Sequence, residues 1–128
     1  MTRLFLFSGG FCALIGVITR SLSSHAIKPF LQERGKLDNF NLATDYLIFH
    51  ALALITVAIL VHTFPEAKFQ RAGLAFIAGS VLFQGSVLIK SCISITPFGF
   101  VTPIGGFVLM AGWVLFMVSA LACTGSSN

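Results

Sequence analysis

Four long apolar stretches constrain this chain more than any other feature. A helix needs about 20 mostly apolar residues to cross the hydrocarbon core of a bilayer, and four segments approach or reach that length: about 4–20, 43–62, 72–93 and 101–123. Charged residues make up only 9% of the chain, whereas a soluble domain carries roughly 25%. A soluble protein this short could not cover its surface with so few charges. The sequence therefore predicts one all-α domain, residues 1–128, that is an integral membrane bundle of four transmembrane helices.

The first apolar stretch follows Arg3 and resembles a signal peptide, but we interpret it as the first membrane span. The net charge of +4 comes from single, scattered bases rather than a basic stripe, so we expect no nucleic-acid partner. The three cysteines form no C-x-x-C motif and are odd in number, which indicates small apolar helix residues rather than a disulfide or metal framework.

Small residues recur on the spans at intervals that suit helix packing. Membrane helices associate through such residues because these let two backbones approach closely. The candidates for helix packing are Gly9 and Gly16 on the first span, Gly79 on the third, and Gly105 and Gly112 on the fourth. Their spacing predicts a tightly packed bundle.

An even number of spans places the first and last loops on the same side of the membrane. The polar residues at the adjoining span ends should therefore gather at one end of the bundle. These candidates for a ligand site or polar network are Arg20, His25, Asp45, Tyr46, His50, Gln84 and Lys90. More bases adjoin this side than the other, five against three, and this asymmetry favours a cytoplasmic first loop.

His50 is the most informative member of this set, because it interrupts the apolar string "DYLIFHALALITVAIL". We expect it near the boundary of the hydrocarbon, one helical turn from Tyr46. An imidazole turned toward lipid would leave two ring nitrogens unsatisfied. His50 should therefore face the interior and hydrogen-bond at least one of His25, Asp45, Gln84 and Lys90.

Three other features carry two interpretations each. Lys90 either extends toward the interface or pairs with Asp45. The first loop has apolar and polar residues over 29–42, which predicts either an amphipathic helix in the headgroup plane or a lid over the polar end. The segment Ile95–Phe107 is rich in proline and glycine, which is compatible with a re-entrant loop; we favour an interfacial turn.

The strings "SHAIKPFL", "ATDYLIFHALAL", "FQGSVL" and "TPFGFVTPIGGFVLMAGW" resemble the small bacterial membrane proteins of the domain of unknown function 423 family, which has a mitochondrial transmembrane relative in eukaryotes. The resemblance runs from about Gly9 to Ala120 and implies four membrane helices, with histidines at the positions of His25 and His50. It implies no established activity. Two departures stand out: "TRSLSSH" replaces a Gly/Ala-rich turn, and Gln84 replaces a serine.

No nucleophile elbow, phosphate loop or close carboxylate pair supports an enzyme. We therefore expect a non-enzymatic binding or accessory protein of the bacterial inner membrane with no cofactor, acting through its polar end and first loop. Its partner would be membrane lipid, a small ligand, another membrane protein or a second copy of the chain. The alternative is a redox, metal, haem or quinone protein that uses His25 and His50. A weaker alternative is a small-solute channel formed by an oligomer.

Overall fold

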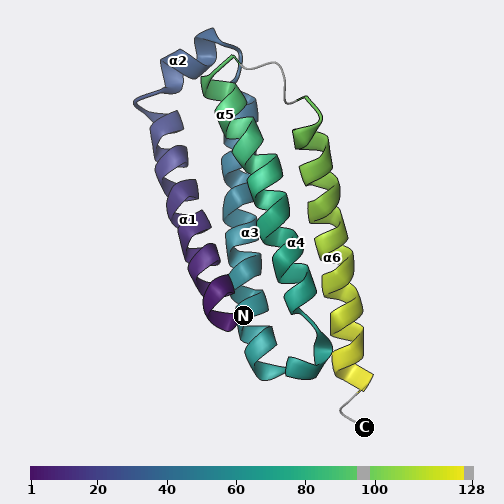
Figure 1. The fold of residues 1–128 in the computed structure, drawn as a ribbon. Helices are drawn as coiled ribbons and strands as arrows, with labels where there is room; N and C mark the ends of the chain where they lie inside the picture. The colour runs from purple at the N-terminus through teal and green to yellow at the C-terminus, as the bar shows by residue number, and fades with distance from the viewer. Residues whose placement is uncertain (95–98, 126–128) are drawn as a thin grey trace.

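The computed structural model describes residues 1–94 and 99–125, and within them it is all-helical (Figure 1). Four helices are long and apolar enough to cross a membrane. They are α1 (Thr2–Ser24), α3 (Leu37–Thr63), a third span over Gln70–Cys92, and α6 (Val101–Gly125). The predicted fold, an integral membrane protein with four helical spans, is confirmed.

The third span is one continuous helix with an irregular middle. It begins as α4 (Gln70–Ser80), widens into a π-helical segment, η2 (Val81–Gly85), and continues as α5 (Ser86–Cys92). A π segment within an α-helix is rare and is frequently found at functional sites. Here it lies where the third span meets both α3 and α6.

Two short elements complete the structure. α2 (Lys28–Glu33) lies in the first loop, and the 3-10 turn η1 (Pro65–Ala67) joins α3 to α4. Gly35 follows the end of α2 by two residues, and its φ of 63° is accessible to glycine without strain. The following amide, Lys36 N–H, donates to Leu31 O at 2.9 Å, which closes the end of α2 and turns the chain into α3.

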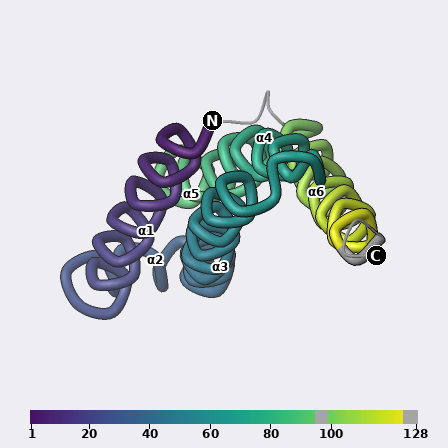
Figure 2. The backbone as a smooth tube through the Cα atoms, turned by 90° about the horizontal axis from the view of Figure 1, so that it is seen from below, coloured from purple at the N-terminus to yellow at the C-terminus, as the bar shows by residue number. Residues whose placement is uncertain are grey.

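The helices form an open row rather than a closed bundle. α1 packs along α3, and α6 packs along the third span, while α3 and the third span join these two pairs. Figure 2 shows α1 and α6 at opposite edges of this row, with α3 and α4 between them. The two edge helices are accordingly the least buried of the four.

The predicted packing glycines lie at these helix contacts. A Cβ on Gly9 would lie 2.9 Å from Ala51 O of α3, and a Cβ on Gly16 would lie 2.6 Å from Ile48 Cγ1. Both distances are shorter than ordinary van der Waals contact, so α1 can approach α3 this closely only with glycine at these positions.

The same holds between the third span and α6. A Cβ on Gly79 would meet Leu109, and one on Gly112 would meet Phe76 at 2.8 Å. Gly105 is the tightest, because its Cβ would contact the backbone nitrogen of Phe83 within the π segment.

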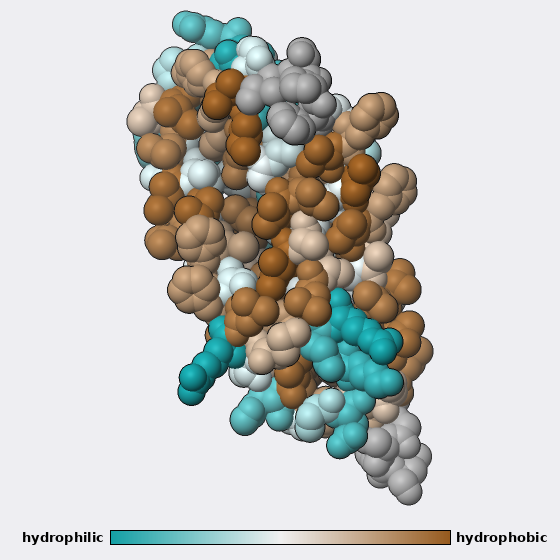
Figure 3. All heavy atoms as spheres, viewed as in Figure 1, coloured by the Kyte–Doolittle hydropathy of each residue, from teal (hydrophilic) through white to brown (hydrophobic). Residues whose placement is uncertain are grey.

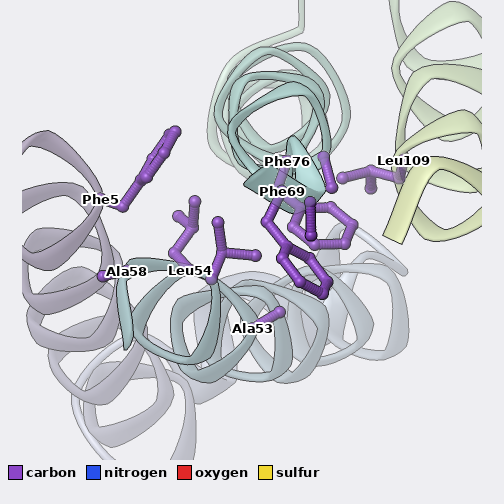
Figure 4. Packing of buried hydrophobic residues seen from close by; sticks show 10 residues of the cluster. Phe5, Ala53, Leu54, Ala58, Phe69, Phe76 and Leu109 are labelled. Atoms are coloured by element: carbon purple, nitrogen blue, oxygen red, sulfur yellow. The ribbon is translucent and has the colours of Figure 1, made fainter. Parts of the chain in front are cut away.

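The core is a layer of apolar side chains shared by all four spans (Figure 4). Phe5 of α1, Leu54 of α3 and Phe76 of α4 are fully buried, and Leu109 of α6 is nearly so. Figure 3 shows apolar side chains across the middle of one face and hydrophilic ones toward its two ends, as a bilayer requires.

α3 begins six residues before the predicted start of its span. The additional turns hold Phe40, which is 3% exposed and packs inward, and Asp38, whose charge suits a helix N-terminus. The expected amphipathic helix over 29–42 is therefore divided between α2 and the start of α3. His50 is the central residue of α3, and its depth relative to the hydrocarbon boundary stays a prediction.

Candidate functional site

His50 lies at the centre of a polar cluster in the middle of the molecule. Its side chain is 7% exposed. The ring nitrogen Nδ1 is 2.7 Å from Tyr46 O and 3.3 Å from Gln84 Nε2, and Nε2 accepts a hydrogen bond from Trp113 Nε1 at 3.2 Å. His50 thus joins three spans, and the expected contact with Gln84 is present.

The hydrogen bonds determine the tautomer of His50. An indole N–H is only a donor, so Nε2 of the imidazole must be unprotonated and Nδ1 must carry the hydrogen. Nδ1–H then donates to Tyr46 O. Both ring nitrogens are engaged, and the imidazole is neutral in this arrangement. The rings of Phe76 and Trp113 lie 5.5 and 5.9 Å from the imidazole, centroid to centroid.

Gln84 is a polar side chain without complete hydrogen bonding. It is fully buried, and its Oε1 has no hydrogen-bond partner among the described residues. Because Nδ1 of His50 carries a hydrogen, the amide oxygen rather than the nitrogen suits the position facing it, and the O/N assignment of an amide can be exchanged. Either orientation leaves one end of the amide unpaired, at a cost of about 1–3 kcal/mol. Ser80 Oγ, four residues earlier, is also buried without a partner within residues 1–94 and 99–125.

A groove runs between α3 and α6 above this cluster, with a volume of about 830 Å³. Figure 2 shows α3 and α6, whose side chains line this groove, on the same side of α4. His50 and Phe83 line its base. The wall residues are Leu42, Tyr46, Phe49, Leu52, Ala53 and Thr56 of α3, with Gly106, Leu109, Met110 and Trp113 of α6.

The groove walls are mostly apolar and strongly exposed. Phe49 is 61% exposed, Leu52 58% and Met110 63%. In a helix that spans a bilayer such side chains face lipid. The groove is therefore a hollow on the lipid-facing surface rather than an enclosed aqueous cavity.

The other predicted polar residues form separate contacts instead of one network. Arg20 Nε and Asp45 Oδ1 are 3.7 Å apart and join α1 to α3, with both side chains nearly half exposed. Lys90 Nζ donates to Thr102 Oγ1 at 3.0 Å, which joins α5 to α6. Of the two interpretations of Lys90, the pair with Asp45 is not formed, because each residue contacts a partner on another helix.

His25 does not approach His50. It ends α1 as an exposed residue at the loop, whereas His50 lies about 20 Å along α3 from Leu37 at the helical rise of 1.5 Å per residue. The structure therefore does not support a site shared by the two histidines. Within the described residues, no three His, Cys, Asp or Glu side chains are placed to hold a metal ion together.

The first loop covers the end of the third span, as the lid interpretation expects. Arg34 Nε donates to Ser91 O at 3.0 Å, and Leu31 is fully buried. Of the segment Ile95–Phe107, residues 95–98 lie outside the described residues, and Val101–Phe107 form the first two turns of α6.

Trp113 is the site residue that sequence reasoning did not assign. It is the chain's only tryptophan, and a partly buried indole N–H usually has a hydrogen-bond partner. α3 and α6 start at the same end of the molecule, and His50 and Trp113 come 13 and 12 residues after Leu37 and Val101. Nearly equal numbers of residues from the starts of the two spans would therefore have predicted that His50 and Trp113 lie at a similar depth.

Comparison with known proteins gives one match. The family described as "Protein of unknown function (DUF423)" matches residues 19–106, well over half of the chain. That range contains His25, His50, Gln84 and Lys90 but ends before Trp113. No curated protein and no solved structure matches the chain significantly.

Proposed function

The chain belongs to the DUF423 family of proteins of unknown function, and on that premise we propose that it is a non-enzymatic protein that binds membrane lipid in the groove between α3 and α6. The resemblance of its motifs to small bacterial membrane proteins favours the bacterial inner membrane as its location. The observation that carries the proposal is the groove itself. Its volume of about 830 Å³ falls in the range of about 300–1,000 Å³ common for small-molecule sites.

The groove suits a lipid chain better than a polar solute. Its walls are aliphatic and aromatic, and the methionine and leucine side chains on them adapt to a flexible occupant. It is open along its side to the bilayer, so a chain can enter without crossing a polar barrier. An acyl chain has no polar groups to satisfy, and the base of the groove offers few, since both nitrogens of His50 are already bonded.

The same bonds weigh against the redox and metal alternative. A metal or a hydrogen-bonded quinone would need a free imidazole nitrogen, and binding through His50 would first break the contact with Trp113 or with Tyr46 O. The distance of His25 removes the second ligand. The open row of helices gives no support to a pore within one chain, and a channel formed by an oligomer stays an alternative.

Trp113 provides the test, because it lines the groove and is the only tryptophan. The protein in detergent is titrated with a phosphatidylglycerol that carries a dibrominated acyl chain, a contact quencher of indole fluorescence. Binding in the groove predicts quenching that saturates at low lipid mole fraction, near one lipid per chain. Quenching that rises in proportion to mole fraction would show only bulk lipid around the protein and would overturn the proposal.

Groove-filling variants make the test specific. Gly106→Leu should remove the saturable phase, because a Cβ there has room and its extension enters the groove. Thr56→Phe fills the groove from the opposite wall, and its position is exposed, so it should not disturb folding. It therefore tests the groove even if Gly106→Leu fails to fold. Gly10→Leu is the matched control on α1, where a Cβ meets nothing within 4 Å. Equal saturable quenching in all four proteins would place the lipid elsewhere and refute the proposal.

A further inference from the structure

A second hollow adjoins the groove at the end of the molecule that holds α2. It has a volume of about 410 Å³, and it shares Leu42 and Phe83 with the groove. A smaller hollow also links the two, because it is lined by Thr102 and Pro103 of the second hollow and by Gly106 and Met110 of the groove. The α3–α6 groove therefore continues toward the loop end of the molecule.

The lining changes character along this path. The main groove is apolar, whereas the second hollow is lined by Lys36, Asn39, Lys90, Ser91 and Thr102 among others. Two lysines and no carboxylate face it. The only ion pair within residues 1–94 and 99–125 joins Arg20 to Asp45, so neither lysine has an acidic partner there.

Lys90 is held in place but keeps free donors. Its ammonium donates to Thr102 Oγ1 at 3.0 Å, and Thr102 Oγ1 is 2.6 Å from Ser86 Oγ. An ammonium has three N–H groups and Thr102 accepts only one. The hydroxyl pair thus positions the cation without neutralising it. Lys36 stands immediately before α3, on the opposite wall.

The distance along α3 from Lys36 to His50 matches the thickness of one leaflet. Fourteen residues separate Lys36 from His50, which is about 21 Å of helix. Half of a bilayer including its headgroups is about 20–22 Å. A lipid whose headgroup lay at the lysines would therefore place its chain along the groove, with the chain end near His50.

From this placement we propose that Lys36 and Lys90 bind the headgroup of a phospholipid with net negative charge, such as phosphatidylglycerol, whose acyl chain occupies the α3–α6 groove. The inference rests on the proposed lipid groove and adds its selectivity. Lysines near a membrane surface each favour anionic lipid by about 1 kcal/mol, which is roughly fivefold in affinity. The wild-type protein should accordingly prefer phosphatidylglycerol to phosphatidylcholine.

The test compares the two headgroups with identical dibrominated chains at constant ionic strength. The mole fraction of lipid at the midpoint of Trp113 quenching should be at least about fivefold lower for phosphatidylglycerol than for phosphatidylcholine. Lys90→Gln and Lys36→Gln should each reduce that preference several-fold and leave phosphatidylcholine binding unchanged. Lys28→Gln is the matched control, because Lys28 is exposed at the same end and does not line the hollow.

The outcomes separate the two proposals. Saturable quenching that depends on Gly106 but is equal for both headgroups would overturn the headgroup inference and leave the groove intact. A Lys28→Gln effect as large as that of Lys90→Gln would also overturn it, because diffuse surface charge would then explain the preference. Loss of saturable quenching with both lipids would remove the proposed function itself.

Discussion

Replacing Gly105 with alanine tests the closest helix contact in the structure. The new Cβ would contact the backbone nitrogen of Phe83 and lie 2.7 Å from the carbonyl carbon of Leu82, whereas ordinary contact begins at 3.4 Å. Backbone atoms of a hydrogen-bonded helix cannot move aside as a side chain does, so α6 must shift outward by several tenths of an ångström or more. Overpacking of this kind costs about 1–3 kcal/mol.

Gly106→Ala is the matched control one residue along. Its Cβ would lie 3.7 Å from the ring of Phe83, which is ordinary contact. Both substitutions replace glycine with alanine in a helix and gain up to about 1 kcal/mol of helix propensity. The difference between the two variants therefore isolates the packing of Gly105 against the π segment.

The assay is unfolding by SDS in mixed micelles, followed by circular dichroism and by Trp113 fluorescence. Gly106→Ala should be as stable as the wild type or slightly more so, and Gly105→Ala should be about 1–3 kcal/mol less stable than Gly106→Ala. Equal unfolding free energies for the two variants would refute the close approach of α6 to Val81–Gly85.

Three further predictions concern other contacts. His50→Gln should retain most of the stability, whereas His50→Leu should lose about 1–3 kcal/mol in the same SDS titration, because it leaves the indole N–H of Trp113 unpaired. Gly112→Leu should destabilise by about 1–3 kcal/mol, because even a Cβ there would lie 2.8 Å from Phe76; an unchanged melting temperature would mean that this face contacts lipid. Arg34→Met should increase hydrogen exchange in α2, because it removes the bond to Ser91 O; unchanged exchange would show that apolar packing alone holds the lid.

The spans and their packing faces could be predicted because each depends on composition and spacing alone. Apolar stretches of membrane-spanning length specify the helices, and glycines at close contacts specify which faces meet. Gly9 and Gly16 were assigned in this way, and the structure places both against α3. The interior position of His50 followed from the cost of an unpaired imidazole in lipid.

The groove could not be predicted in the same way, because it depends on how the helices are arranged relative to one another. Convergence of polar residues at one end predicted that His50 would contact at least one of several candidates, and Gln84 is that contact. The row of helices divides Asp45 and Lys90 among other neighbours. The π segment carries no sequence signature, and the buried Gln84 lies within it. The headgroup of the bound lipid and the orientation of the protein in its membrane stay predictions.

The pairing of consecutive spans in the open row has a consequence for how the chain is made. α1 and α3 form one helical hairpin and the third span and α6 form another, and the contact between the hairpins is smaller than the contact within either. As the chain leaves the ribosome, the first hairpin can insert and pair while the second is still being synthesised. His50 belongs to the first hairpin, but Gln84 and Trp113 belong to the second. α6 is synthesised after the third span, and its Trp113 therefore completes the hydrogen bonds of an imidazole that the first hairpin already carries.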